Sequence, residues 1–251
     1  MSPDGLRARM RRRDALCGTF VKTPDVQIVE VLAHAGLDFI CFDAEHSPFD
    51  RGRLDACLAV AGALGLEALV RVPAGTPAEI LKALDAGARG VVVPHCASVE
   101  MAESIAAAAH FGHGGRGFAG STRWAGFGSR PMADVLAMDA DTVVIGQIEE
   151  PEGVAAAAEI AAVEDIDGLF VGPADLAVCY GVTDIAGPEV RGALASVSAA
   201  ARAAGKAAVT FTPTAEMAVE LREMGVNMAF IGSEHSFLLK SAKETSAAFH
   251  A

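Results

Sequence analysis

The sequence has few aromatic residues: Phe, Trp and Tyr make up 6% of its 251 residues, with one Trp and one Tyr. Few surfaces are therefore available for stacking sugar rings. Its five cysteines are odd in number and form no C-x-x-C pair, so neither a disulfide framework nor a zinc site is indicated. This use of cysteine argues against a secreted, disulfide-stapled domain and favours a reducing compartment.

Basic residues are also scarce. Lys and Arg number 20 against 32 Asp and Glu, which gives a formal net charge of −12 and an isoelectric point near 5.0. Nucleic acids and anionic membranes reward clustered basic side chains, so neither is expected as a partner. No apolar run approaches the roughly 20 residues that span a bilayer, and the N-terminal residues lack the apolar core of a signal peptide. The expected location is the cytoplasm.

The one basic cluster lies at residues 7–13, RARMRRR. Sequence typical of a folded domain follows it directly. Because short basic runs are usually solvated, residues 1–16 are predicted to form a solvent-exposed arm or first helix rather than a binding patch.

Short apolar segments alternate with alanine-rich amphipathic segments along the whole chain, a pattern typical of β/α units around a parallel sheet. Helices are predicted in every gap; one of them has Thr76 as its N-cap and Gly87 as its C-terminal stop. The predicted strands number eight and cover residues 18–21, 38–46, 67–73, 90–96, 142–150, 168–175, 206–212 and 227–235.

Eight such units in about 250 residues match the count and size of a (β/α)₈ TIM barrel. Residues 1–251 are therefore predicted to form a single barrel domain, with a C-terminal helix at 236–251. A doubly wound open sheet is the alternative α/β fold. The sequence has no G-x-G-x-x-G fingerprint after its first strand and no Walker loop, which favours the barrel.

One connection departs from the regular pattern. Residues 112–130 hold seven glycines and the only tryptophan, Trp124. Long loops in compact domains are often functional. The segment is therefore either a lid or substrate-facing loop, or a flexible surface loop, and the sequence favours neither.

Polar residues gather at the predicted C-terminal ends of the strands, where the reacting groups of such barrels lie. Alternation in the fifth strand puts Gln147 and Glu149 on the inward face and small or apolar residues on the other. Glu150 instead begins the turn into a helix at Pro151, where negative charge is favourable. The inward Glu149 has no such structural explanation and indicates function.

Asp175 ends the predicted sixth strand, so it and Glu149 come from neighbouring strands. Alone, Asp175 could equally be a helix N-cap. Two carboxylates without nearby Cys form a hard oxygen site that suits Mg²⁺ or Mn²⁺, with Co²⁺ as a further candidate. The acid–base pair of a glycoside hydrolase is the alternative, and the low aromatic content disfavours it.

Other strand-end residues have chemical potential. Asp43-x-x-His46 is a candidate base oriented by a carboxylate, although residues at strand ends also cap helices. Arg71 shares the inward face of the third strand and would place a cation in the barrel mouth. A Schiff-base aldolase needs a desolvated lysine near the mouth. Among five lysines, only Lys22, after the first strand, is placed for that role.

These stretches resemble the metal-dependent (class II) pyruvate aldolases typified by 4-hydroxy-2-oxoheptanedioate aldolase, together with the 2-keto-3-deoxy-sugar-acid aldolases. The resemblance covers nearly the whole chain, in order and spacing, and rests on FDAEHSPFD, VRVP, ALDAGARGVVVPH, GGRGF, GQIEEPEG and DGLFVGPADLA. It implies a TIM barrel of the phosphoenolpyruvate/pyruvate type. It also implies a divalent-metal-dependent lyase that reversibly cleaves a 4-hydroxy-2-oxo acid to pyruvate and an aldehyde, assembled as a homo-oligomer, either a hexamer or a trimer.

The resemblance assigns roles to individual residues. It implies that Glu149 and Asp175 are metal ligands and that Gln147 lies beside the metal. It also implies that His46 and Asp43 form a dyad acting through water, and that Arg71 contacts the pyruvyl oxygen. It further implies that the main chain around Gly172 and Ala174 contacts the pyruvyl carboxylate. Asp85 is implied to approach the site of a neighbouring subunit.

Three stretches depart from the family pattern. Gly18-Thr19-Phe20 stands where G-x-W is usual, Trp124 stands where a small residue is usual, and the eighth strand ends in Glu234-His235. All three bear on the aldehyde half of the substrate, so the aldehyde is not predicted. Two alternatives stay open: a phosphoenolpyruvate-type C–C or C–P lyase or isomerase, and a non-catalytic barrel that binds a 2-oxo acid as a sensor.

Overall fold

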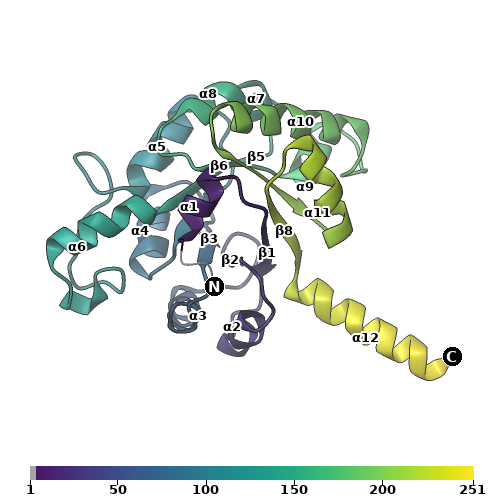
Figure 1. Cartoon of the computed structure of the whole chain (residues 1–251), viewed down its shortest axis with the longest axis horizontal. Coiled ribbons are helices and arrows are strands. Elements are labelled where there is room, and N and C mark those ends of the chain that lie inside the picture. Colours follow the sequence, from purple (N-terminus) through teal and green to yellow (C-terminus); the bar gives the residue numbers. More distant parts are fainter. Residues whose placement is uncertain (1–3) are drawn as a thin grey trace.

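The fold is a closed barrel of parallel strands in a computed structural model that describes residues 4–251. The strands pair in sequence order from β1 to β8, and β8 pairs with β1 to close the ring (Figure 1). Their bounds are Leu16–Val21 (β1), Phe39–Asp43 (β2), Ala68–Arg71 (β3), Gly90–Val93 (β4), Val143–Ile148 (β5), Gly168–Val171 (β6), Ala207–Thr212 (β7) and Met228–Ser233 (β8). The predicted (β/α)₈ fold is confirmed, and the open sheet is wrong.

Helices connect the strands and cover the outside of the barrel. They are Val26–Ala33 (α2), Arg51–Ala63 (α3), Pro77–Asp85 (α4), Val99–Ala109 (α5), Met132–Ala137 (α6), Pro151–Ala155 (α7), Ala157–Ala162 (α8), Pro173–Cys179 (α9), Pro188–Ala203 (α10) and Ala215–Leu221 (α11). The predicted caps of α4 are present, since the Thr76 hydroxyl accepts from the Glu79 backbone N–H at 3.4 Å and Gly87 has φ +100°. Such a φ favours glycine.

Strand alternation divides the core into two parts. Alternate side chains of every strand point outward against the helices, and the others fill the barrel interior. The interior includes a group of aromatic rings, in which Phe230 lies 4.8 Å from Phe39 and 5.0 Å from both Phe20 and Phe170, measured between ring centroids. Because these rings fill the interior, polar side chains on the inward face can meet only at the two ends.

Six of the eight strands end earlier than predicted, whereas β1 and β7 end at the predicted residues 21 and 212. β2 ends at Asp43 rather than at residue 46, and β6 ends at Val171 rather than at residue 175. The predicted strands include the polar residues that follow each ladder, because the apolar pattern alone does not mark where the ladder hydrogen bonds stop. Asp175 consequently lies in the first turn of α9 instead of at a strand end.

The N-terminal basic cluster closes the other end of the barrel. Its residues form helix α1 (Leu6–Arg11), and Arg7 is 6% exposed, with Nε donating to Asp167 Oδ1 at 2.7 Å. Arg13 donates to the Gly225 carbonyl at 2.7 Å. The prediction of a helix is confirmed, but the prediction that the cluster is solvated is wrong for Arg7, because a buried carboxylate pairs with its guanidinium.

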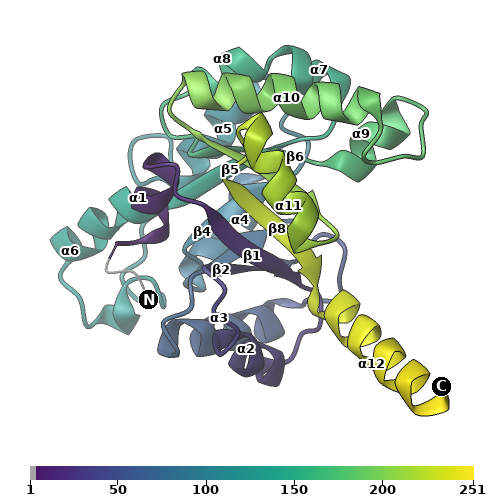
Figure 2. The same ribbon diagram turned by 45° about the vertical axis from the view of Figure 1, so that its right-hand side comes forward.

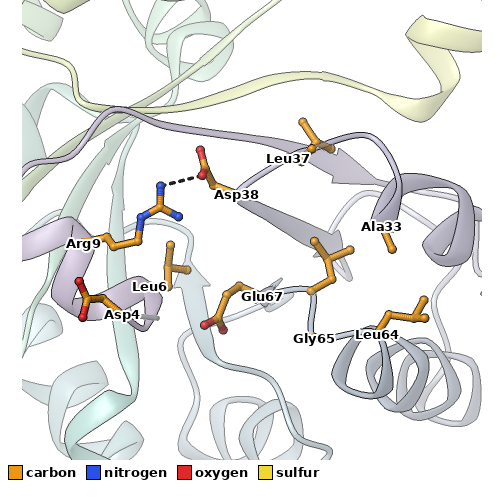
Figure 3. A pocket seen from close by; sticks show the side chains of 11 residues that line it. Asp4, Leu6, Arg9, Ala33, Leu37, Asp38, Leu64, Gly65 and Glu67 are labelled. Atoms are coloured by element: carbon orange, nitrogen blue, oxygen red, sulfur yellow. Dashed lines mark hydrogen bonds and ion pairs between the residues drawn. The ribbon is translucent and has the colours of Figure 1, made fainter. Parts of the chain in front are cut away.

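A cavity of about 400 Å³ lies beside α1 at this same end (Figure 3). Two of its polar side chains satisfy each other, since Arg9 Nη2 donates to Asp38 Oδ1 at 2.7 Å. The cavity is therefore a feature of the end opposite the strands' C-termini.

The glycine-rich segment 112–130 also belongs to the N-terminal side of the strands, because it leads from α5 into β5. Trp124 is 5% exposed and packs with Ala125 and Val135, and its backbone N–H donates to the Asp85 carbonyl at the end of α4. The segment does not cover the mouth of its own barrel, so a lid over that mouth is wrong. Its packed Trp124 is equally unlike a loose surface loop.

The last helix departs from the barrel. Helix α12 (Glu234–His250) begins at the C-terminal end of β8 and projects away from the other elements (Figures 1 and 2). It leaves exposed the large apolar side chains of Phe237, Leu238, Leu239 and Phe249. No helix among residues 4–251 is long and apolar enough to cross a membrane.

Candidate active site

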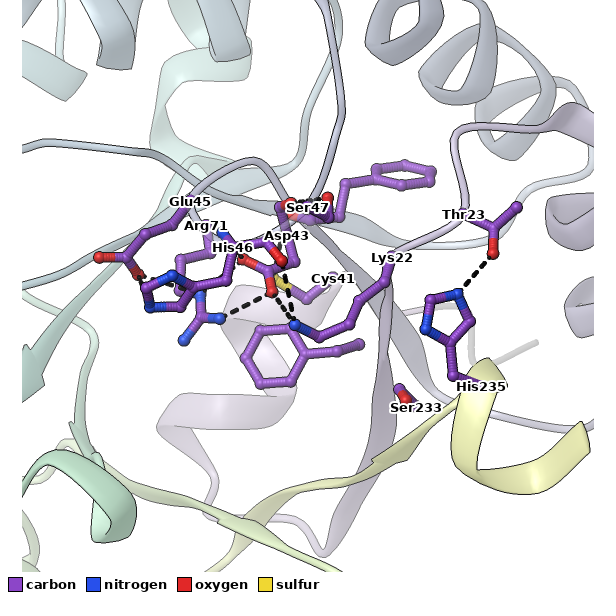
Figure 4. Close-up of polar contacts among 12 residues, drawn as sticks. Lys22, Thr23, Cys41, Asp43, Glu45, His46, Ser47, Arg71, Ser233 and His235 are labelled. Atoms are coloured by element: carbon purple, nitrogen blue, oxygen red, sulfur yellow. Dashed lines mark hydrogen bonds and ion pairs between the residues drawn. The ribbon is translucent and has the colours of Figure 1, made fainter. Parts of the chain in front are cut away.

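The C-terminal mouth of the barrel gathers charged side chains on the inward register of several strands. β2 contributes Asp43, β3 contributes Arg71, and β5 contributes Gln147 and, one step beyond its end, Glu149. Lys22 continues the inward face of β1 (Figure 4). Because the aromatic interior lies beneath them, these groups form the floor of the mouth.

Asp43 is the most enclosed of these groups, with no exposed surface. Arg71 donates from Nε to Oδ1 at 3.0 Å and from Nη2 to Oδ2 at 2.8 Å, and Lys22 Nζ lies 2.7 Å from Oδ2 (Figure 4). Burial alone would raise the pKa of Asp43, but the hydrogen bonds and charge of Arg71, with Lys22, lower it to about 2. The carboxylate is therefore ionised whenever the protein is folded at ordinary pH.

The expected Asp43–His46 pair is joined through the main chain. The backbone N–H of His46 donates to Asp43 Oδ1 at 3.1 Å. The imidazole is 61% exposed, and its Nε2 lies 3.7 Å from Glu45 Oε2. Glu45 is mostly enclosed, and burial raises its pKa. Orientation of the ring by Asp43 stays a prediction. Glu45 is a neighbour of the ring for which no role was predicted.

Glu149 is buried in the mouth, with its side chain 3% exposed. The backbone N–H of His95 donates to its Oε1 at 2.7 Å, and Gln147 Nε2 donates to Oε2. A Cβ at Gly172 would lie 3.1 Å from Oε2, so a larger residue there would crowd the carboxylate and require it to shift. The inward Glu149 predicted from alternation is confirmed as a placement, and it is held from three sides.

His95, near the end of the predicted strand 90–96, is another mouth residue for which no role was predicted. Its Nδ1 lies 3.2 Å from Glu149 Oε1 and 3.0 Å from Glu150 Oε1. Partial burial opposes protonation, but the two carboxylates outweigh it and raise the pKa of His95. Its φ of +57°, which is uncommon outside glycine, directs its backbone N–H to Glu149. Glu150 is also the N-cap of α7, as predicted.

The oxygen atoms around Glu149 fit a hard divalent cation. Gln147 Oε1 is buried and has no hydrogen-bond partner among residues 4–251, and the exposed carboxylate of Asp175 follows the adjacent strand. Carboxylate and amide oxygens suit Mg²⁺ or Mn²⁺ better than soft metals. Within the described part of the chain no cluster of three His, Cys, Asp or Glu side chains could hold a metal, so most of the coordination shell would come from water and substrate.

Comparison with known proteins identifies the family of the chain. The family model HpcH/HpaI aldolase/citrate lyase matches residues 16–241. The chain belongs to this family. A hydroxypyruvate/pyruvate aldolase from Paraburkholderia phytofirmans is 34% identical over 247 residues, which cover 95% of each protein. A 4-hydroxy-2-oxovalerate aldolase from Rhodococcus jostii is 32% identical, over 92% of this chain and 90% of the relative.

A solved structure from the same family has the same fold. An HpcH/HpaI aldolase/citrate lyase family protein from Burkholderia cenocepacia superposes with a TM-score of 0.94 at 35% identity, over 98% of this chain and 99% of that one. The protein is a carbon–carbon lyase, and the predicted resemblance to the class II pyruvate aldolases is confirmed. The non-catalytic sensor is thereby disfavoured.

Among the residues implied by the resemblance, Asp85 lies apart from the mouth of this aldolase. Asp85 ends α4 at the opposite side, where Arg116 Nη2 donates to its Oδ1 at 2.6 Å. An approach of Asp85 to a neighbouring subunit stays a prediction. Ala174 is exposed in the first turn of α9, two residues after the buried Gly172.

The unexplained Glu234-His235 pair meets the end of β1. Glu234 Oε1 accepts from the backbone N–H groups of Lys22 at 2.9 Å and Thr23 at 2.6 Å. The Thr23 hydroxyl lies 2.9 Å from His235 Nε2 (Figure 4). The start of α12 therefore fixes the turn that presents Lys22, an arrangement that the sequence could not reveal.

Proposed function

We propose that this aldolase reversibly cleaves a 4-hydroxy-2-oxo acid to pyruvate and an aldehyde, with a divalent metal as cofactor. The observation that carries the proposal is the meeting of Arg71, held rigidly by Asp43, with the buried carboxylate of Glu149 in one mouth. A cation and a hard-oxygen site in the same mouth suit a substrate that is an anion and becomes more negative at its keto oxygen.

Arg71 is the residue that meets the developing charge. Its guanidinium is planar, always protonated and fixed by two hydrogen bonds, so it need not reorganise during the reaction. Asp43 is the positioning partner. When the bond between C3 and C4 breaks, its electron pair moves into the pyruvyl unit, and a fixed donor at the keto oxygen stabilises that charge.

His46 is the proposed base. Cleavage requires removal of the proton from the 4-hydroxyl group, and the exposed imidazole can take it through water. In the direction of synthesis the same ring returns a proton to the new hydroxyl. Its main chain is fixed by Asp43, whereas its ring is free to turn towards substrate or towards Glu45.

Glu149 and Asp175 are the proposed metal ligands, with Gln147 beside them. A divalent ion there, Mg²⁺ or Mn²⁺ with Co²⁺ as a further candidate, would supply Lewis-acid polarisation of the 2-oxo group. The main chain around Gly172 and Ala174 is the proposed contact for the pyruvyl carboxylate, because the absence of a side chain at Gly172 leaves the substrate room beside Glu149.

The direct test is a panel of 4-hydroxy-2-oxo acids with different chain ends. We expect pyruvate release, followed by its reduction with lactate dehydrogenase and NADH, for at least one member, and we expect the release to depend on added Mg²⁺ or Mn²⁺. An enzyme that releases no pyruvate from any of them, but turns over a phosphoenolpyruvate analogue, would replace this proposal with the lyase or isomerase alternative.

We further propose that the protein is a homo-oligomer, a hexamer or a trimer. Leu238 is 72% exposed and Phe249 is 84% exposed on the projecting α12, and a single chain offers these apolar side chains no cover. Light scattering after size-exclusion chromatography should report an assembly for the wild type and a smaller species for Leu238→Glu with Phe249→Glu. Val31→Glu on α2 is the control for adding a carboxylate to an exposed apolar site.

A further inference from the structure

Lys22 belongs to the mouth of the barrel. Leu16 and Phe20 of β1 lie in the interior cluster, and alternation carries that face on to Lys22. Its side chain is only 29% exposed, and its ammonium points at Asp43 (Figure 4). A lysine with these neighbours is part of the reaction site rather than of the outer surface.

The charges around Arg71 require a further cation. Asp43 binds the guanidinium at two points, and Glu45 Oε2 lies 3.3 Å from Nε. One arginine facing two carboxylates would leave a net negative charge where an anionic substrate must bind. With Lys22 2.7 Å from Asp43, the four side chains are balanced.

The position of Lys22 is fixed from behind. Glu234 accepts from the backbone N–H groups of Lys22 and Thr23, and Glu234 is only 8% exposed. The ammonium therefore reaches Asp43 from a turn that cannot readily move. The lowered pKa of Asp43 agrees with two cations sharing one buried carboxylate.

We propose that Lys22 is a positioning residue of the aldol reaction: by sharing Asp43 with Arg71, it leaves the charge of Arg71 available to the pyruvyl oxygen. This inference rests on the proposed function. The step that it assists is removal of a C3 proton from pyruvate, in which the C–H bond breaks, the proton passes to the base and then to solvent, and the electron pair moves towards the keto oxygen.

That step can be followed without any aldehyde. In D₂O, exchange of the methyl protons of pyruvate for deuterium is read by proton NMR. A hydrogen bond between charged groups is worth enough that we expect the maximal exchange rate of Lys22→Met to fall by about tenfold or more, with a smaller change in KM for pyruvate. Lys22→Arg should restore most of the rate, and Lys82→Met, on the outer face of α4, should exchange like the wild type.

A second measurement does not depend on turnover or metal. Unfolding in urea, with chelator present, is compared for wild type, Lys22→Met, Asp43→Asn and the double variant. If Lys22 acts through Asp43, the double variant should lose less stability than the sum of the single losses. Additive losses would overturn the inference.

The kinetic outcomes separate the inference from the proposed function. Exchange by Lys22→Met within twofold of wild type, or Lys22→Arg as slow as Lys22→Met, would overturn the role of Lys22 and leave the aldolase mechanism standing. A wild-type enzyme that exchanges no pyruvate protons with Mg²⁺ or Mn²⁺ would instead overturn the mechanism on which the inference rests.

Discussion

Arg71 donates a hydrogen bond to each oxygen of Asp43, from Nε to Oδ1 at 3.0 Å and from Nη2 to Oδ2 at 2.8 Å. The two residues lie directly opposite each other at the ends of the paired strands β2 and β3. Strand register therefore sets the geometry of the pair before any substrate binds. The guanidinium also lies 4.5 Å from the centroid of the Phe20 ring, which supports it from the barrel interior.

Replacing the guanidinium of Arg71 by the ammonium of lysine tests this arrangement. Arg71→Lys keeps one positive charge but cannot bind both oxygens of Asp43 in the same plane. We expect kcat to fall by about 10²–10³, as on loss of an oxyanion donor, while the folded state survives. Steady-state kinetics and circular dichroism measure the two effects, and a wild-type kcat in this variant would remove Arg71 from the mechanism.

Asp43 should make part of the protein's stability dependent on pH. Its folded pKa of about 2 lies below its ordinary value of 3.8, so the unfolded state takes up its proton first as pH falls. The stabilisation, about 2 kcal/mol from this shift, is complete above about pH 4 and is lost as the pH approaches 2.

The difference in unfolding free energy between wild type and Asp43→Asn measures the pH-dependent stabilisation by Asp43. We expect the difference to be largest at neutral pH and to shrink between about pH 4 and pH 2, as measured by urea unfolding at several pH values. A difference that stays constant across this range would show that Asp43 has an ordinary pKa in the folded state.

Local patterns in the sequence were sufficient for the barrel and for much of its mouth. Alternation placed Gln147 and Glu149 on the inward face, and the N-cap at Thr76 is where the pattern put it. Strand ends were less accurate, since Glu45 lies beyond the end of β2 and Asp175 lies in the first turn of α9. Where a strand stops depends on its partner's hydrogen bonds, which no single segment encodes.

Contacts between distant segments were beyond reach of the sequence. Glu234 holds the backbone of Lys22 across 212 positions, and Arg7 pairs with Asp167 across 160. Both contacts exist only because the barrel closes, bringing β8 beside β1 and α1 over the opposite end. A charge run reads as solvated until its buried partners are known, and for this reason the prediction failed at Arg7.

Variants can test whether His46 is the base and whether Glu45 beside it contributes to the reaction. If His46 is the base, His46→Ala should lose about 10²–10⁴ in rate, and the acidic limb of its kcat/KM profile should disappear. Glu45→Gln removes the carboxylate nearest the ring, so it should retain activity and lower the rate less than His46→Ala does. A Glu45→Gln variant as slow as His46→Ala would show that Glu45 itself takes part in the reaction, and an acidic limb unchanged in His46→Ala would assign the base elsewhere.

Metal dependence is tested most directly at Glu149 and Asp175. Two carboxylates with water and substrate completing the shell hold Mg²⁺ or Mn²⁺ loosely enough for a chelator to remove. We expect EDTA to abolish activity and added Mn²⁺ or Mg²⁺ to restore it without refolding. Because binding to the folded state alone raises stability, Mn²⁺ should also raise the Tm of the wild type. It should not raise the Tm of Glu149→Gln or Asp175→Asn.

The same experiment distinguishes metal chemistry from a Schiff base. Lys22 is the lysine at the mouth, but its nitrogen lies 2.7 Å from Asp43 Oδ2, so it is held by a carboxylate rather than presented to a carbonyl as a Schiff-base lysine must be. Treatment with pyruvate and borohydride should therefore leave no adduct on Lys22 by mass spectrometry. Activity that survives thorough chelation, together with a pyruvyl adduct on Lys22, would show that Glu149 and Asp175 are not the ligands on which catalysis depends.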